Sequence, residues 1–302
     1  MTKHISHFRA MAYALAGHTI WVLGDTCTKL AGQMRMPPVQ IIVLCSLFAI
    51  LTIGVVTVAR GRARFLKPAR VKLEFGRGLM WSVQSFTNVI SFTVFPLATV
   101  YTLLFTVPLL SSLGAAFSLR ERLSLRNGLA ILAGFGGVLL AVGPEKFDLG
   151  DHSWTHCAVL FTFPLLAAVN TVWIRFMSRT ESSESMALFP MLVRTVVLLP
   201  FCLWYFEPLT EKGLLAVMGL GFFGGVGFLF VMAAYKHAPV ALIVPFQYTQ
   251  LITGAIVGYL IWSDVPSWNL LGGAAVITAS GLYIVHRARQ TAVKTVAVSY
   301  EP

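Results

Sequence analysis

Asp25 is the side chain in this sequence whose position most strongly suggests chemistry. It lies near the end of a long apolar stretch, where an ionised carboxylate costs roughly 2.5–3.5 kcal/mol on membrane-insertion scales and therefore faces a cavity or a partner. Lys29 follows about one helical turn later, so a local ion pair is one interpretation. The other is a cation or proton site at the mouth of a cavity. Asn170 occupies nearly the same place in the second half of the chain.

Arg194 is a second charge inside an apolar stretch, and it too must be paired or hydrated. One interpretation is structural, with the guanidinium tying neighbouring helices to backbone carbonyls. The other is an anion contact with the carboxylate or phosphate of a ligand. We therefore treat Arg194, together with Lys29, as a structural or anion-contacting residue.

A polar stripe runs along the predicted helix 75–95. Trp81, Gln84 and Asn88 recur at three- and four-residue spacing, which places them on one side of a helix. Amides that face lipid are poorly satisfied, so the stripe faces other helices or water. One interpretation is hydrogen bonding between helices, where each hydrogen bond contributes about 0.6 kcal/mol. We favour the other, a cavity wall with Trp81 as an aromatic platform.

A third polar group starts at Pro245, inside the predicted helix 240–261. This proline frees a carbonyl one turn earlier, which kinks or breaks a helix and offers backbone groups to a ligand. The nearby amides and phenol cannot all face lipid. Tyr101 belongs to the corresponding group in the first half, where ordinary packing is the alternative. The candidate binding residues are Asp25, Trp81, Gln84, Asn88, Tyr101, Asn170, Gln247, Tyr248 and Gln250.

These residues are carried by about ten apolar stretches, each long enough to cross a hydrocarbon core of ~30 Å as a helix. The chain is 57% hydrophobic and 12% charged, with a mean hydropathy of +0.76, whereas soluble domains are about a quarter charged. The composition therefore predicts an all-α integral membrane protein of ten transmembrane helices. The predicted helices are 9–29, 37–59, 75–95, 99–119, 125–143, 154–177, 187–205, 212–235, 240–261 and 268–286.

Positive charge falls on alternate gaps between these helices. Eighteen of the 23 Lys and Arg residues lie at the termini and in the gaps on one side. The positive-inside rule makes that side cytoplasmic, so we expect both termini inside a bacterial-type inner membrane. The net charge of +11 is explained by this orientation, since seven cations fall between Arg60 and Arg77 beside an anionic leaflet. We expect the lipid bilayer as a partner and no nucleic acid.

Enzyme motifs are missing from the sequence. It has no P-loop GxxxxGK[ST], no HExxH and no GxSxG. A formal GxGxxG at Gly219–Gly224 follows no predicted strand, so we reject a dinucleotide site. The four cysteines form no CxxC pair and read as reduced packing residues. We expect no enzyme activity, no metal and no cofactor.

The two halves of the chain echo each other. Pro96-Leu-Ala recurs as Pro239-Val-Ala after 143 residues, and Glu121 matches Asp264 at the same offset. A repeat of five spans is odd, so the second copy enters the membrane from the other side, which is an inverted-topology repeat. We predict a first repeat at 9–143, a second at 154–286 and a disordered tail at 287–302.

Short motifs along most of the chain extend this pattern. They are Asp25-Thr-Cys-Thr-Lys29, Pro38-Val-Gln40, Arg77-Gly78, Phe95-Pro96-Leu-Ala98, Pro108-Leu109, Glu121-Arg122-Leu123, Gly134-Phe-Gly-Gly137, Ala238-Pro239-Val, Val244-Pro245-Phe246-Gln247-Tyr248 and Ser280-Gly281. In this order they resemble the EamA-type transporters of the drug/metabolite transporter superfamily, which have two five-helix repeats. One departure is Cys45, where the family usually has an arginine.

The resemblance implies a secondary transporter that moves a small organic metabolite by alternating access. Amino acids and their derivatives are the implied substrates, efflux is the commoner direction, and a proton or ion is a possible coupling partner. Uptake of a larger metabolite such as S-adenosylmethionine or a flavin is an alternative. A membrane-embedded enzyme or a scaffold is the alternative of another class. The family places the first, third, fourth, sixth, eighth and ninth helices around the cavity, and the oligomeric state stays open.

Overall fold

A computed structural model describes residues 2–118, 125–142, 154–177, 180–237 and 244–298, and these residues form helices and no strand. The α-helices are α1 (Thr2–Gln33), α2 (Pro38–Ala59), α3 (Val71–Val94), α4 (Leu97–Leu104), α5 (Val107–Ser118), α6 (Leu125–Val142), α7 (Trp154–Met177), α8 (Ser183–Trp204), α9 (Glu211–His237), α11 (Thr249–Trp262) and α12 (Trp268–Val298). Two 3₁₀ helices are η1 (Ala63–Leu66) and η3 (Val244–Tyr248). The predicted all-α fold class is confirmed.

Two predicted helices are broken in the structure. The predicted helix 99–119 consists of α4 and α5, which are separated at Phe105 and Thr106. The predicted helix 240–261 is described from Val244 onward as η3 followed by α11. Pro108 lies in the first turn of α5, where its missing N–H costs little. The two breaks are 143 residues apart, the same offset that relates the sequence motifs.

The C-terminal helix is longer than the sequence predicts. The apolar pattern ends near residue 286 and the prediction places a disordered tail after it, but α12 continues to Val298. Seven of the twelve residues from 287 to 298 are Ala, Arg, Gln or Lys, which are strong helix formers, so the helix continues beyond its apolar part.

Four helices in the described part of the chain are long and apolar enough to cross a membrane. Their spanning segments are Pro38–Ala59, Trp154–Ile174, Glu184–Trp204 and Glu211–Val231. Shorter apolar helices cover Leu97–Ser111 and Gly128–Ala141. These two segments are shorter than the roughly 20 residues that a membrane-spanning helix needs.

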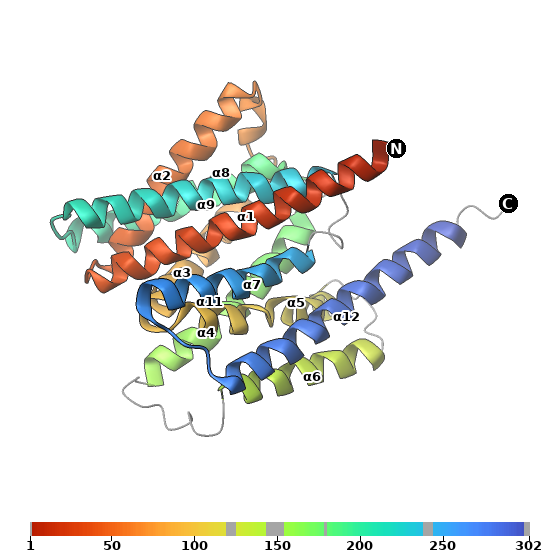
Figure 1. The fold of residues 1–302 in the computed structure, drawn as a ribbon. Coiled ribbons are helices and arrows are strands. Elements are labelled where there is room, and N and C mark those ends of the chain that lie inside the picture. Colours follow the sequence, from red (N-terminus) through yellow and green to blue (C-terminus); the bar gives the residue numbers. More distant parts are fainter. Residues whose placement is uncertain (1, 119–124, 143–153, 178–179, 238–243, 299–302) are drawn as a thin grey trace.

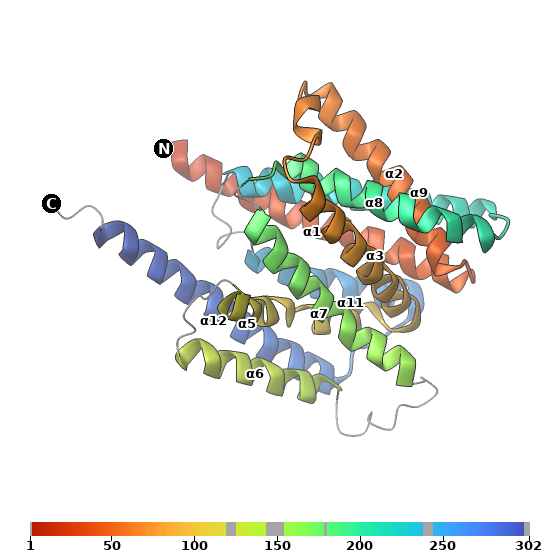
Figure 2. The ribbon, with the colours of Figure 1, turned by 180° about the vertical axis from the view of Figure 1, so that it is seen from behind.

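The helices form two groups. Figure 1 shows α1, α2, α8 and α9 together above α4, α6, α11 and α12, and the reverse view in Figure 2 shows the same division. Helices α3 and α7 lie between the groups, and α3 contacts both α7 and α8. Each group therefore contains helices from both halves of the chain.

The helix contacts follow the symmetry that two repeats predict. The pair α1 and α9 has its counterpart in α7 and α3, and the pair α2 and α9 has its counterpart in α3 and α8. The pairs α2 with α8, α4 with α11, and α6 with α12 each join corresponding helices of the two halves. This pattern supports the proposed repeat, although Glu121, the predicted counterpart of Asp264, lies outside the described residues.

Small residues let these pairs approach closely. A Cβ added at Gly17 of α1 would lie 3.0 Å from the carbonyl oxygen of Gly227 of α9. A Cβ added at Gly273 of α12 would overlap the carbonyl oxygen of Gly137 and the side chain of Ala141 in α6. Backbones that meet this closely are typical of helix pairs in membranes.

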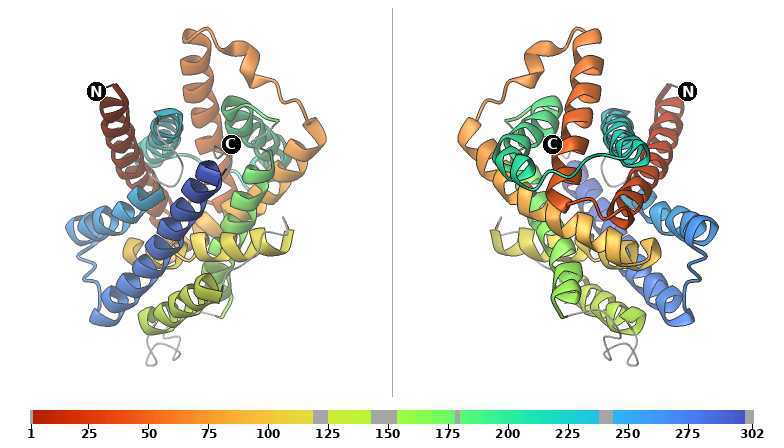
Figure 3. Two further views of the ribbon diagram at one scale, coloured as in Figure 1. Left: turned by 90° about the vertical axis from the view of Figure 1, so that its right-hand side faces the viewer. Right: turned by 90° about the vertical axis from the view of Figure 1, so that its left-hand side faces the viewer.

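The connections between helices lie at two ends of the bundle, and Figure 3 shows the N-terminus and the α2–α3 connection near the top of the molecule. We call the end with the N-terminus and the α2–α3 connection the basic end, which the charge pattern predicts to be cytoplasmic. The end with the α1–α2, α3–α4, α8–α9 and α11–α12 connections is called the far end.

Candidate functional site

Asp25 on α1 faces the interior of the bundle. Its carboxylate accepts a hydrogen bond of 2.6 Å from the hydroxyl of Tyr101 on α4, and the Tyr101 side chain is fully buried. The local pair with Lys29 is not formed, because Lys29 binds Asp264 after α11 with an Nζ to Oδ2 distance of 2.8 Å. The two neighbouring charges of α1 therefore have separate partners.

One face of α1 makes polar side-chain contacts with α4, with α11 and with the connection after α11. Asp25, Lys29 and Gln33 are four residues apart, so they lie above one another on the helix. The Lys29 ammonium also lies 4.3 Å from the centre of the Trp262 ring. Gln33 Oε1 accepts a hydrogen bond of 2.8 Å from Trp262 Nε1. We call these three residues and their partners the α1 seam.

Aromatic rings cluster behind Asp25. The Tyr101 ring packs edge-on against Phe92 of α3 at 5.4 Å between ring centres. Phe105, at the break after α4, packs against Tyr248 at the end of η3 at 4.8 Å. All four rings belong to one buried cluster. Tyr101 and Tyr248, which the sequence places in different halves, therefore share a core with Asp25 at its edge.

Several predicted site residues carry buried polar atoms that have no hydrogen-bond partner. They come from three elements: Gln84 Oε1 on α3, Asn170 Oδ1 on α7, and Gln247 Nε2 with Tyr248 Oη on η3. A buried polar atom left unsatisfied costs roughly 1–3 kcal/mol. Native structures normally satisfy such atoms with protein, water or a ligand. Each of these atoms is therefore a candidate to bind solvent or a solute.

His18 on α1 is a residue that the sequence analysis did not select. Both of its ring nitrogens are buried without a partner, and its ring packs against Trp21 at 5.5 Å. A lone histidine on an apolar helix gives no sequence signal that separates a core position from a binding position. In the structure, the two buried nitrogens without a partner are what makes His18 a candidate binding position.

The polar residues of α3 face two different neighbours. Trp81 and Ser85 contact Arg194 of α8: the guanidinium lies 4.9 Å from the Trp81 ring centre, and Arg194 Nη1 donates to Ser85 Oγ at 2.6 Å. Gln84 and Asn88 are eight and four residues before Phe92 and so share the face that reaches Tyr101. Trp81 is therefore a partner of Arg194, away from the ring cluster where a platform was expected.

Arg194 is almost completely buried by these contacts. Its geometry supports the structural interpretation, because it joins α8 to α3 at mid-helix.

Two further predicted binding residues, Asn88 on α3 and Gln250 on α11, are half-buried.

A cavity of about 550 Å³ opens at the far end between α1, α2, α3 and α7. The predicted binding residues do not line it, and its polar lining comes from Arg35, Thr93, Thr155, His156 and Glu207. Within the described residues there is no group of three His, Cys, Asp or Glu side chains that could hold a metal ion.

Comparison with known proteins agrees with this architecture. Residues 154–286 match the EamA-like transporter family. A solved crystal structure aligns with 93% of this chain and 98% of its own length, with a TM-score of 0.66 and 21% identity, which shows a shared fold. The chain is thus an all-helical, multi-pass membrane protein whose residues 154–286 match the EamA-like transporter family.

Curated relatives are transporters. An S-adenosylmethionine uptake transporter of Rickettsia felis is 27% identical over 51% of each chain. A riboflavin transporter of Brucella anthropi is 25% identical over 53% of this chain and 57% of its own. The pseudopaline exporter CntI of Pseudomonas aeruginosa is 25% identical over 47% and 50%. The chain thus matches about half the length of these relatives.

The resemblance seen in the sequence is thereby confirmed. The protein carries an EamA-like domain and has relatives in the drug/metabolite transporter superfamily. The domain match covers the range predicted for the second repeat, and the first repeat stays a prediction.

Proposed function

We propose that this protein is a secondary transporter that moves a small organic metabolite across the inner membrane by alternating access. One observation carries the proposal: an interior carboxylate, Asp25, borders a buried aromatic cluster beside polar atoms that lack partners. These groups come from α1, α3, α4, α7 and η3, so a solute between them would contact both groups of helices. A solute held there is released when the groups separate.

The chemistry of this site suggests the class of solute. A carboxylate that accepts from a tyrosine suits an amine or another cation, aromatic rings offer flat apolar or cation–π contacts, and amides orient a polar end. We propose an amphipathic solute such as an amino acid derivative, with efflux as the expected direction. The relatives are named for three different metabolites and for both uptake and export, so they support the class of solute.

The α1 seam suggests how access to the far end is controlled. Asp25, Lys29 and Gln33 bind α4, α11 and the connection after α11, so they hold the far end together. Opening toward that side requires these contacts to break. A solute amine that competes with Tyr101 for Asp25 would loosen the seam at its innermost contact. An ion gradient or the gradient of the solute itself would supply the driving force.

A ligand screen followed by transport tests the proposal. The purified full-length protein is screened with metabolites for an increase in thermal unfolding temperature. Each stabilising compound is then tested for counterflow in proteoliposomes. We expect at least one amphipathic compound to stabilise the protein and to exchange. Stabilising compounds that bind without any exchange would contradict the transport function.

The variant Asp25→Asn tests the site itself. We expect exchange of an identified solute to fall at least tenfold, which corresponds to about 1.4 kcal/mol, with little change in unfolding temperature. The matched control is Glu211→Gln, which removes an exposed carboxylate at the start of α9 and should exchange normally. Unchanged exchange per folded molecule in Asp25→Asn would contradict a binding role and favour a structural one.

A further inference from the structure

The connection between α2 and α3 at the basic end is built around the short helix η1. Gly61 turns the chain with a left-handed φ of 65° directly after α2. Five cations of this stretch are exposed: Arg60, Arg64, Lys67, Arg70 and Lys72. Within the described part of the chain, none of the five forms an ion pair with a carboxylate. We call residues 60–72 the cationic platform.

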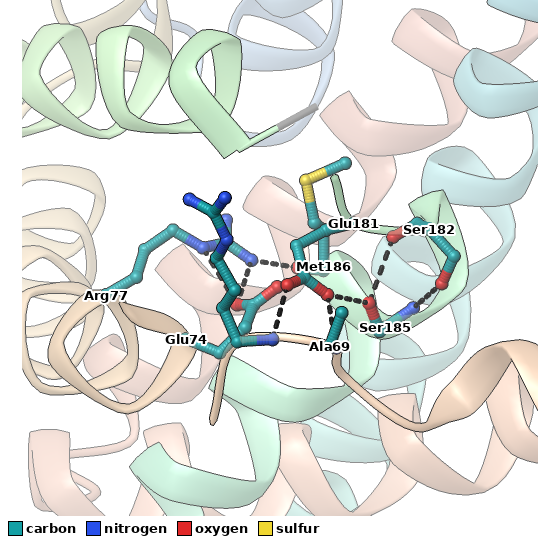
Figure 4. Close-up of polar contacts among 8 residues, drawn as sticks. Ala69, Glu74, Arg77, Glu181, Ser182, Ser185 and Met186 are labelled. Atoms are coloured by element: carbon teal, nitrogen blue, oxygen red, sulfur yellow. Dashed lines mark hydrogen bonds and ion pairs between the residues drawn. The ribbon is translucent and has the colours of Figure 1, made fainter. Parts of the chain in front are cut away.

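Glu181, in the turn between α7 and α8, holds the platform in place. Its two carboxylate oxygens accept hydrogen bonds from the backbone N–H groups of Ala69 at 2.8 Å and Arg70 at 2.6 Å. Figure 4 shows this carboxylate lying against Ala69, with Ser185 on its other side. Ser182 donates to the carbonyl oxygen of Phe65. A carboxylate thus fixes the backbone of a basic segment without pairing with any of its five exposed cations.

Neighbouring contacts make this end of the bundle rigid. Arg77 of α3 pairs with Glu74 at 3.1 Å and donates to the carbonyl oxygen of Met186 in α8. Arg62 pairs with Glu184 at 2.8 Å. The carboxylates of this region are therefore engaged with backbone or with the inner arginines, and the five outer cations keep their charge available.

Apolar side chains mark the membrane level beside the platform. Val55 and Val58 are exposed in the last turns of α2, and Val71 and Phe75 are exposed in the first turns of α3. Exposed apolar residues on both helices next to the connection suit contact with acyl chains. The cations between them then lie at the level of lipid headgroups.

From this arrangement, we propose that the cationic platform is a binding site for the phosphate headgroups of anionic phospholipids. Arginine presents a planar fork that matches phosphate oxygens, and lysine adds a compact charge. Each cation near an anionic surface contributes about a fivefold increase in affinity. Because Glu181 already orders the backbone, less conformational entropy is lost when lipid binds.

Lipid bound at this platform would also strengthen the contact between α3 and α8. The platform precedes α3, whereas Glu181 and Ser182 precede α8, so the two parts come from different halves of the chain. The lipid site does not depend on transport being the function.

Lipid titration on the full-length protein in neutral detergent tests the proposal. Phosphatidylglycerol and phosphatidylcholine are added separately, and bound lipid is counted by native mass spectrometry. We expect preferential binding of phosphatidylglycerol that falls roughly 25-fold in Lys67→Gln/Lys72→Gln, by the fivefold factor for each cation. The matched control, Arg9→Gln/Arg126→Gln, removes two exposed cations outside the platform and should bind nearly normally. Equal losses in both pairs would overturn the platform as a site.

Glu181→Ala separates an ordered site from general charge attraction. This variant makes the protein more positive, so general attraction predicts tighter binding of phosphatidylglycerol. The proposed site predicts weaker binding, because Ala69 and Arg70 lose their acceptor. Glu181→Gln, which keeps one acceptor oxygen, should lie between the two and remain folded. Tighter binding in both Glu181 variants would overturn the proposal.

A soluble competitor distinguishes membrane lipid from free phosphate. Glycerol phosphate carries the same charged group without acyl chains. We expect it to displace phosphatidylglycerol poorly, because the apolar contacts beside the platform are lost. Displacement as effective as that by short-chain phosphatidylglycerol would contradict a lipid site.

Discussion

At the scale of single residues, the partners of Asp25 and Lys29 show how tertiary contacts replace local ones. A pair of opposite charges one turn apart contributes only about 0.2–0.5 kcal/mol on a helix surface. Asp25 instead accepts from the buried hydroxyl of Tyr101, and Lys29 binds Asp264 beside the Trp262 ring. Charge-assisted hydrogen bonds of this kind are about twice as strong as neutral ones. The contacts with two distant partners are therefore formed in place of the local ion pair.

Arg194 gives a residue-scale prediction, because its contacts favour one of its two interpretations. We expect Arg194→Met to lower stability by about 1–3 kcal/mol, since Ser85 loses its donor and Trp81 its cation. Exchange per folded molecule should stay normal. Thermal unfolding and counterflow measure the two effects.

The control for this prediction is Arg126→Met, which changes an exposed arginine at the start of α6 and should leave stability nearly unchanged. A double-mutant cycle with Ser85→Ala should show coupling between residues 85 and 194. An intact unfolding temperature with lost exchange would instead identify Arg194 as an anion contact for the solute.

At the scale of elements, the two broken helices are the main departure from the predicted spans. Both breaks could be predicted, because Pro108 and Pro245 each remove a backbone donor from the predicted helix. The ring of Pro108 also clashes with the carbonyl group four residues earlier in a continuous helix, and α4 ends at that residue, Leu104. Packing of Phe105 against Tyr248 joins the two breaks, and this contact requires both halves to be folded.

The crossing of α6 and α12 gives an element-scale prediction. We expect Gly273→Ala to destabilise the protein by about 1–3 kcal/mol, because the new methyl group would overlap the backbone of Gly137. Gly136→Ala is the matched control, since the same methyl group meets open space there. Unfolding titrations in detergent measure both variants, and equal stability would show that the two helices cross less closely.

At the scale of the whole molecule, the α1 seam joins groups of helices that each combine both halves of the chain. We expect Asp264→Asn to lower exchange and stability, because buried Lys29 loses its carboxylate. Hydrogen bonds to charged groups contribute about 1.5–3 kcal/mol. The double variant Lys29→Asp/Asp264→Lys, which swaps the two charges, should recover part of the lost solute exchange and part of the lost stability. Counterflow measures the first recovery and thermal unfolding measures the second.

Glu211→Gln controls for this experiment, since it removes an exposed carboxylate at the same end. It should exchange normally. A seam that only stabilises the fold would show lost stability in Asp264→Asn with normal exchange per folded molecule, and that outcome would contradict a role in access.

The sequence by itself determined the fold class, the helices and the resemblance to EamA-type transporters. Hydropathy, charge and repeat spacing are read along the chain, so they need no knowledge of which helices meet. It also identified Gln84, Gln247 and Tyr248 as polar residues that lipid cannot satisfy, and Asn170 as the counterpart of Asp25 in the second half. The structure leaves atoms of all four without a partner inside the bundle.

Only the tertiary structure decided which of these residues meet. Asp25 and Tyr101 are 76 residues apart, and Lys29 and Asp264 are 235 apart. Such pairs depend on how each helix is rotated and how closely its neighbour approaches, which local periodicity leaves open. The same dependence turned Trp81 toward Arg194 and joined the basic connection to Glu181. Packing between distant helices thus decides which of these polar residues contact one another.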